Sequence, residues 1–159
     1  MLQAINYLKK RNMTSIGILG FSLSAATALL INSQDVKAIV SDSSFSSMYD
    51  IMKKVFFIFP WITKYPFIWL TSFYARIFLG MNISELSPEE NVKSVKTPIL
   101  FIHGTEDSQI PVEHSKILHK NALNSELWLV EGADHGMSFS GNPEEYEKKA
   151  LDFFDKHLF

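Results

Sequence analysis

A serine, an aspartate and a histidine each follow a short apolar run, in the order Ser22, Asp107 and His135. A serine hydroxyl becomes a nucleophile when a histidine takes its proton, and a carboxylate holds that histidine in the required tautomer. Together the three side chains could attack a carbonyl carbon and form an acyl-enzyme. This chemistry requires the folded chain to bring all three to one place.

The residues around the serine are typical of a sharp turn between a strand and a helix. Gly20-Phe21-Ser22-Leu23-Ser24 follows an apolar run and opens a stretch of small residues. Such a segment predicts a nucleophile elbow, in which the serine oxygen projects from the strand end and the backbone N–H of Leu23 faces a developing oxyanion. An ordinary serine N-cap of a helix is the alternative interpretation.

The other two side chains follow two later apolar runs. Asp107 comes shortly after the pair His103-Gly104, and His135 directly follows Asp134. We interpret His103 as a structural residue at the strand end. Adjacent side chains seldom face each other, so we interpret Asp134 as solvated or turn-forming rather than as the partner of His135.

Four short runs rich in Ile, Val and Leu predict the strands that position these residues, and helical patterns alternate with them. This alternation predicts an α/β fold, and runs without polar alternation fit a mostly parallel sheet flanked by helices. The carboxyl ends of parallel strands share one edge, where such sheets place their sites. The predicted strands are Ser15–Leu19, Ala38–Ser41, Pro98–Ile102 and Leu127–Val130, and the predicted helices are Met1–Arg11, Leu23–Asn32, Pro111–Asn121 and Pro143–His157.

The segment 46–92 interrupts the alternation and is too long for an ordinary connection, which predicts a helical, aromatic-rich insertion between core segments 1–45 and 93–159. The first interpretation is a cap whose apolar faces pack on the sheet edge and on each other. The second is a lid that lines an apolar substrate pocket, and the weakest is association with a membrane surface. The candidate pocket residues are Phe21, Phe45, Phe57, Trp61 and Trp69.

Composition excludes several other classes. The chain has 159 residues and a formal net charge of −2, with 15 Lys and Arg against 17 Asp and Glu, so nucleic acid is not an expected partner. No cysteine is present, and no His-x-x-x-His pair is backed by carboxylates, so we expect no metal site and no cofactor. The longest uncharged run of the apolar segment before Lys64, 55–63, is too short to span a bilayer, which disfavours a transmembrane helix. The location of the protein stays open, with the cytoplasm slightly favoured.

These motifs together resemble the carboxyl-terminal half of a serine hydrolase of the α/β-hydrolase superfamily, close to its Bem46-like and small bacterial esterase/peptidase members. The similarity rests on the turn around Ser22, the segment Thr97–Gly104, Asp107 with its following Ile-Pro, and the Gly-x-x-His segment that ends at His135. It implies that the four strands correspond to the superfamily's fifth to eighth. It also implies Ser22 as nucleophile, Asp107 as acid and His135 as general base.

Asp42 is the alternative acid, because it follows a strand from which some members of the superfamily take theirs. We prefer Asp107, whose His-Gly-x-x-Asp turn matches better, and Asp42 is readily explained as capping its own turn. Ser24 departs from the second glycine that is usual in the elbow, but it is small enough to fit.

A larger departure lies before the elbow. In the superfamily, four strands and the loop that supplies a second oxyanion donor precede it, whereas in this sequence only about one helix does. Loss of one such donor costs about 10²–10³ in rate, and the strand 15–19 becomes an apolar edge that invites pairing with another chain. Two functions therefore stay open. The first is a serine hydrolase acting on an ester, thioester or amide of a small molecule or peptide with an apolar group. The second is a non-catalytic half-domain that is stable only by self-association, with a homodimer through strand 15–19.

Overall fold

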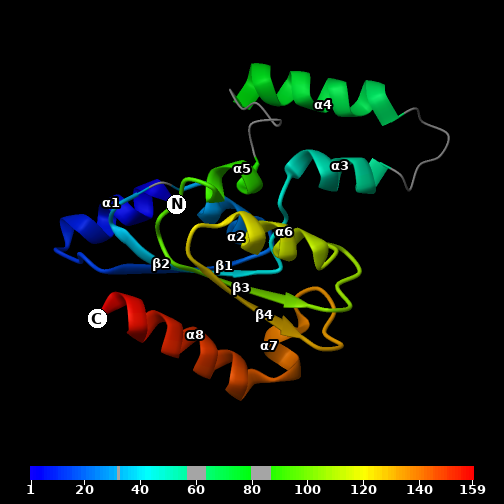
Figure 1. Ribbon diagram of the computed structural model, residues 1–159. Coiled ribbons are helices and arrows are strands. Elements are labelled where there is room, and N and C mark those ends of the chain that lie inside the picture. The colour runs from blue at the N-terminus through cyan, green and yellow to red at the C-terminus, as the bar shows by residue number, and fades with distance from the viewer. Residues whose placement is uncertain (32, 57–63, 80–86) are drawn as a thin grey trace. The chain divides into compact units, whose positions relative to one another are not determined.

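The computed structural model describes residues 1–31, 33–56, 64–79 and 87–159, which form two compact units (Figure 1). The core unit comprises Met1–Ser46 and Pro88–Phe159, and the inserted unit comprises Ser47–Ser87. The division therefore places the short helix α5 (Pro88–Val92) in the core unit, whereas the sequence suggested that the insertion extends to Val92. The reason is packing, because Val92 is fully buried in the core.

The core unit is built on a parallel sheet of four strands in the order β1-β2-β3-β4. This arrangement confirms the predicted α/β class, and every strand ends at the same edge of the sheet. Three backbone bonds of one kind tie that edge together: Ser22 N–H donates to the Asp42 carbonyl at 2.8 Å, Ser43 N–H to the Ile102 carbonyl at 2.9 Å, and Thr105 N–H to the Val130 carbonyl at 3.0 Å. The strands are β1 (Ile16–Phe21), β2 (Val36–Asp42), β3 (Ile99–Gly104) and β4 (Ser125–Val130).

Helices cover both faces of the sheet (Figure 1). The helices α1 (Leu2–Lys10), α2 (Leu23–Leu29), α5 and α6 (Glu113–Asn121) lie on one face, and α8 (Pro143–Leu158) lies on the other. The five-residue helix α7 (Met137–Gly141), which periodicity did not predict, follows β4 and leads into α8. The short helix α5 was not predicted as a separate helix either, whereas α1, α2, α6 and α8 were predicted to within three residues at each end.

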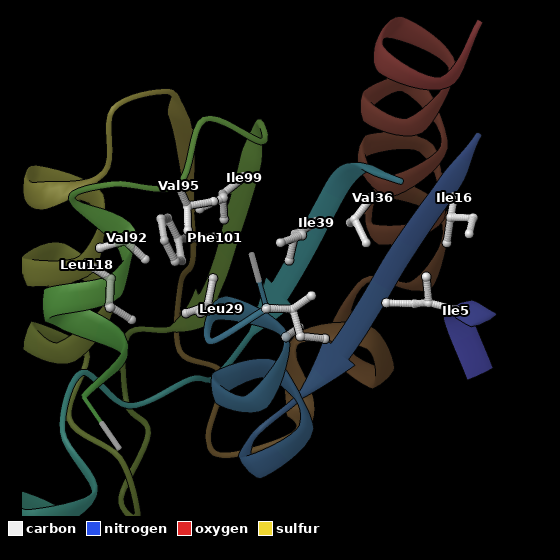
Figure 2. Packing of buried hydrophobic residues seen from close by; sticks show 12 residues of the cluster. Ile5, Ile16, Leu29, Val36, Ile39, Val92, Val95, Ile99, Phe101 and Leu118 are labelled. Atoms are coloured by element: carbon white, nitrogen blue, oxygen red, sulfur yellow. The ribbon is translucent and has the colours of Figure 1, made fainter. Parts of the chain in front are cut away.

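Alternate residues of the strands point into two hydrophobic clusters, one on each face. Ile39 and Phe101 pack with Ile5, Leu29 and the other residues that Figure 2 shows on the α1/α2 face. The neighbouring residues of the same strands, with Tyr146 and Phe153 of α8, form the cluster on the opposite face. Burial of a large aliphatic or aromatic side chain contributes roughly 1.5–3 kcal/mol, so the two clusters hold the site-bearing strands in place.

The described residues of the inserted unit include the helices α3 (Met48–Phe56) and α4 (Lys64–Leu79). Aromatic rings stack along α4 at i, i+4 spacing, with centroids 5.7 Å apart for Trp69 and Phe73 and 5.6 Å apart for Tyr74 and Phe78. Among the residues described, no helix is both long and apolar enough to pass through a bilayer.

Candidate active site

Ser22 occupies a tight turn between β1 and α2. Its backbone has φ 52°, a left-handed conformation that is rare for a residue with a side chain and costs of order 1–3 kcal/mol. Gly20 makes the turn possible, because a Cβ there would lie 2.7 Å from the backbone of Ala25. The sequence predicted this turn from small residues at these positions, and the structure has it.

Ser24 stabilises the turn directly. Its Oγ accepts a hydrogen bond from the Phe21 N–H at 2.9 Å and donates one to the Phe21 carbonyl at 2.7 Å. A glycine at this position would make neither bond. The departure from the usual elbow motif is therefore compensated by two hydrogen bonds across the turn, which the sequence analysis did not foresee.

The structure brings Ser22, His135 and Asp107 together at the carboxyl edge of the sheet. His135 Nε2 lies 3.2 Å from Ser22 Oγ, and His135 Nδ1 lies 2.7 Å from Asp107 Oδ2. A carboxylate only accepts hydrogen bonds, so Nδ1 carries the proton and Nε2 presents its lone pair to the hydroxyl. Both distances are within the range of proton transfer between a nucleophile and its base.

The loops that carry Asp107 and His135 are fixed by further hydrogen bonds. Asp107 is buried, and its Oδ1 accepts the backbone N–H groups of Gln109 at 3.0 Å and Ile110 at 2.7 Å. Asp134 Oδ1 accepts the Ser108 N–H at 2.8 Å and the His135 N–H at 2.7 Å. The hydrogen bond from the Ser108 N–H, followed by that from His135, lowers the pKa of Asp134. Asp134 thus joins the loop that carries Asp107 to the loop that carries His135.

Asp42, the alternative acid, does more than cap its own turn. It is buried; its Oδ1 accepts the Ser43 hydroxyl at 3.0 Å and the Ser138 hydroxyl at 3.4 Å, and its Oδ2 accepts the Tyr146 hydroxyl at 3.0 Å. Burial raises the pKa of Asp42 in spite of these bonds. The sequence suggested that it caps its own turn, and in the structure it connects β2 to α7 and α8. The Nδ1 of His135 bonds to Asp107 instead.

Leu23 is the first residue of α2, directly after Ser22. Backbone N–H groups at a helix N-terminus carry the positive end of the helix dipole. The position of Leu23 therefore suits a donor to an oxyanion beside Ser22.

The five expected pocket residues differ in their exposure and in the unit to which they belong. Phe21 is 42% exposed and its ring centroid lies 5.0 Å from that of His135, so it borders the site. Phe45 is only 5% exposed and belongs to the interior of the core unit. Trp69 is exposed on α4 of the inserted unit, and Phe57 and Trp61 lie outside the described residues.

Comparison with known proteins identifies the family. The sequence profile of the prolyl oligopeptidase family matches residues 1–159, so the chain belongs to that family and to the α/β-hydrolase superfamily. The uncharacterized protein YqkD of Bacillus subtilis is 27% identical over 145 residues, which are 88% of this chain and 48% of that protein. The uncharacterized peptidase YuxL of the same species is 30% identical over 79 residues, which are 45% of this chain and 12% of that protein.

Solved structures share the fold. An esterase of Pyrococcus furiosus superposes with a TM-score of 0.73 at 22% identity, over 99% of this chain and 61% of that one. The acylaminoacyl peptidase of Pyrococcus horikoshii superposes with a TM-score of 0.69 at 22% identity, over 96% of this chain and 26% of that one. The chain spans about half the length of YqkD, with 48% of that protein covered.

Proposed function

We propose that this member of the prolyl oligopeptidase family is a serine hydrolase that cleaves an ester, thioester or amide through an acyl-enzyme on Ser22. The observation that carries the proposal is the continuous contact from Ser22 Oγ to His135 at 3.2 Å and from His135 to Asp107 at 2.7 Å. Similarity to proteins described as an esterase and an acylaminoacyl peptidase supports the reaction class.

In the proposed reaction, Ser22 Oγ attacks the carbonyl carbon while His135 Nε2 takes the hydroxyl proton. The carbonyl oxygen becomes an oxyanion that accepts the Leu23 N–H, and Asp107 stabilises the imidazolium. The tetrahedral intermediate then breaks the bond to the leaving group, which receives the proton from His135. Water then attacks the acyl carbon while His135 Nε2 takes a proton from it. His135 returns that proton to Ser22 Oγ as the acyl–oxygen bond breaks, which releases the acid and the free Ser22 hydroxyl.

The substrate that fits is a small molecule or peptide with an apolar group beside the scissile bond. Phe21 presents an exposed aromatic ring next to the His135 imidazole. An apolar acyl or side-chain group packed on this ring would lose contact with water, which contributes about 25 cal/mol per Å². Hydrolysis of p-nitrophenyl esters of increasing chain length would test this preference.

Labelling with a fluorophosphonate probe tests the nucleophile. The unmodified protein is expected to react, and Ser22→Ala is expected to abolish labelling because the probe bonds to the activated hydroxyl. Ser94→Ala is a matched control, since Ser94 is exposed and its hydroxyl bonds only to the nearby Asn91 carbonyl among the bonds described. Labelling that persists in Ser22→Ala would remove the proposed role of Ser22.

The second candidate function is a half-domain that associates with a second copy through β1. In the part of the chain that the structure describes, β1 pairs only with β2, and Leu19 and Phe21 of β1 are 52% and 42% exposed. An uncharged apolar edge favours pairing with another strand. Sedimentation of the chain with and without Leu19→Lys decides this point: a concentration-dependent dimer that the lysine disrupts supports it, whereas an active monomer contradicts it.

A further inference from the structure

A second histidine lies against the acid of the proposed triad. His103, at the end of β3, is fully buried, and its Nε2 lies 3.3 Å from Asp107 Oδ2, the same oxygen that contacts His135. The same Nε2 lies 2.8 Å from the Ile110 carbonyl, and Nδ1 lies 2.6 Å from the hydroxyl of the buried Ser115. The sequence suggested only a structural role for this residue.

These partners define where the His103 protons are. A carbonyl oxygen only accepts hydrogen bonds, so Nε2 carries a hydrogen that it donates to Ile110. The Ser115 hydroxyl can donate to Nδ1 or accept from it, so both ring nitrogens have a hydrogen-bond partner. The same nitrogen lies 3.3 Å from Asp107 Oδ2, so the partial positive charge of its N–H group lies beside that carboxylate oxygen.

His103 holds the acid in two ways. It contacts the carboxylate directly, and it holds the Ile110 carbonyl while the Ile110 N–H donates to Asp107 Oδ1 at 2.7 Å. Both ends of the 107–110 turn are thus tied to one side chain that cannot move, because it is enclosed in the core.

We propose that His103 is a positioning residue that orients Asp107 and limits how strongly the Asp107 charge stabilises the protonated form of His135. This role rests on the proposed serine hydrolase function. With His103 in place, Asp107 Oδ2 is shared between two imidazoles. Without it, His135 receives the full charge of that oxygen and keeps its proton to higher pH.

Other charged groups near the pair come from neighbouring elements. Asp42 of β2 is close enough to interact electrostatically with His103, and Asp134 interacts with His135 and accepts its backbone N–H. Both are present in every variant proposed below, so a shift caused by His103 can be separated from their effects.

The test compares the pH dependence of kcat and KM for a p-nitrophenyl ester in three variants, with rates normalised to fluorophosphonate-titrated sites. His103→Leu is expected to lower kcat about tenfold with KM unchanged, as the loss of one polar contact implies, and to move the acid limb of kcat/KM to higher pH. His103→Gln carries an amide N–H near the position of Nε2 and should restore most of both. Ser115→Ala, which frees Nδ1, should shift the acid limb less and in the same direction.

A purely structural role would reduce the number of titrated sites but leave kcat per site and the acid limb unchanged, and that result would overturn the proposal. If His103→Leu does not fold, His103→Gln and Ser115→Ala still test whether His103 affects the acid limb. Histidine ring NMR titration of His135 in a Ser22→Ala background needs no turnover. A His135 titration that responds to His103 in a protein without hydrolase activity would reject the proposed function alone, whereas an active enzyme with an unmoved titration would reject this inference alone.

Discussion

The core unit and the inserted unit depart from the usual distribution of side chains in opposite ways. The core unit buries polar groups: Ser41, Asp42, Ser43, Ser44, Ser46, His103, Asp107, Ser115 and Ser138. Among the described residues, no buried side-chain nitrogen or oxygen is without a hydrogen-bond partner. Exposed apolar groups are scattered over the core unit, whereas in the inserted unit they follow one another along α4: Trp69, Leu70, Phe73, Tyr74, Ile77 and Phe78.

The two arrangements have different physical consequences. A buried polar network is costly unless every member is paired, and once it is paired it specifies one geometry. Exposed aromatic residues do little to fix one geometry, because they lose few contacts when their side chains move. Substitutions in the core network should therefore change chemistry and folding strongly, and substitutions on α4 should change both weakly.

The largest expected effect is on the proposed acid. Asp107→Asn should lower kcat by about 10⁴, because an amide no longer holds His135 in the required tautomer, and the folded structure should be retained. Steady-state kinetics with circular dichroism would measure this. Asp42→Asn is the matched control, and an equal loss of kcat in that variant would transfer the role of the acid to Asp42.

The next effect concerns the turn before Ser22. Gly20→Ala places a Cβ 2.7 Å from the Ala25 backbone, and such overpacking costs about 1–3 kcal/mol of unfolding free energy or more. Urea unfolding would measure the loss. Gly141→Ala is the control, because a Cβ there meets nothing within 4 Å. Equal midpoints for the two variants would show that the turn is not tightly packed.

A pH-dependent effect is expected at Asp42, whose pKa burial raises above its ordinary value of 3.8. The folded state then holds this proton more tightly than the unfolded state, so the contribution of Asp42 to stability is greatest at low pH and falls as pH rises through the raised pKa. Asn does not titrate. The unfolding free energy of the unmodified protein minus that of Asp42→Asn should therefore fall from pH 4 to pH 7, by about 1.4 kcal/mol for each unit of pKa increase. Urea unfolding of both proteins at both pH values checks this. An unfolding free energy of the unmodified protein that rises with pH relative to the variant contradicts it.

The smallest effect is expected on α4. Phe78→Ala removes one ring of the Tyr74–Phe78 stack, which contributes about 0.5–1.5 kcal/mol, and the core unit should be unaffected. Hydrogen exchange of the α4 amides would report the change, with Leu70→Ala as an exposed control on the same helix. A large loss of core stability would contradict the expectation that substitutions on α4 have only weak effects.

The sequence was sufficient to predict those parts of the fold that depend on local pattern. Apolar runs identified all four strands, although β4 begins at Ser125 rather than Leu127, because Ser125 and Glu126 are polar yet pair with Ile99 and Leu100 of β3. Ser22, Asp107 and His135 meet at one edge of the sheet, as expected of residues that follow the carboxyl ends of parallel strands. This expectation depends on the shared direction of the strands.

The missed features depend on partners that lie far apart or on hydrogen bonds with no sequence signature. Tyr146 reaches Asp42 across a separation of 104 residues, and no local pattern links them. The role of Ser24 required knowledge of the exact turn, because its hydroxyl bonds twice to the same neighbouring backbone. The contact between His103 and Asp107 was within reach of the sequence, since four positions along the chain separate them.

The backbone bonds at the carboxyl edge also bear on how the sequence can diverge. Ser22, Ser43 and Thr105 each donate a main-chain N–H to the end of the neighbouring strand, and main-chain groups do not depend on residue identity, except at proline. Side chains along these strands can therefore be replaced over generations without changing the spacing between the strand ends that carry Ser22 and His135. The esterase of Pyrococcus furiosus, which is only 22% identical, still shares the fold with a TM-score of 0.73.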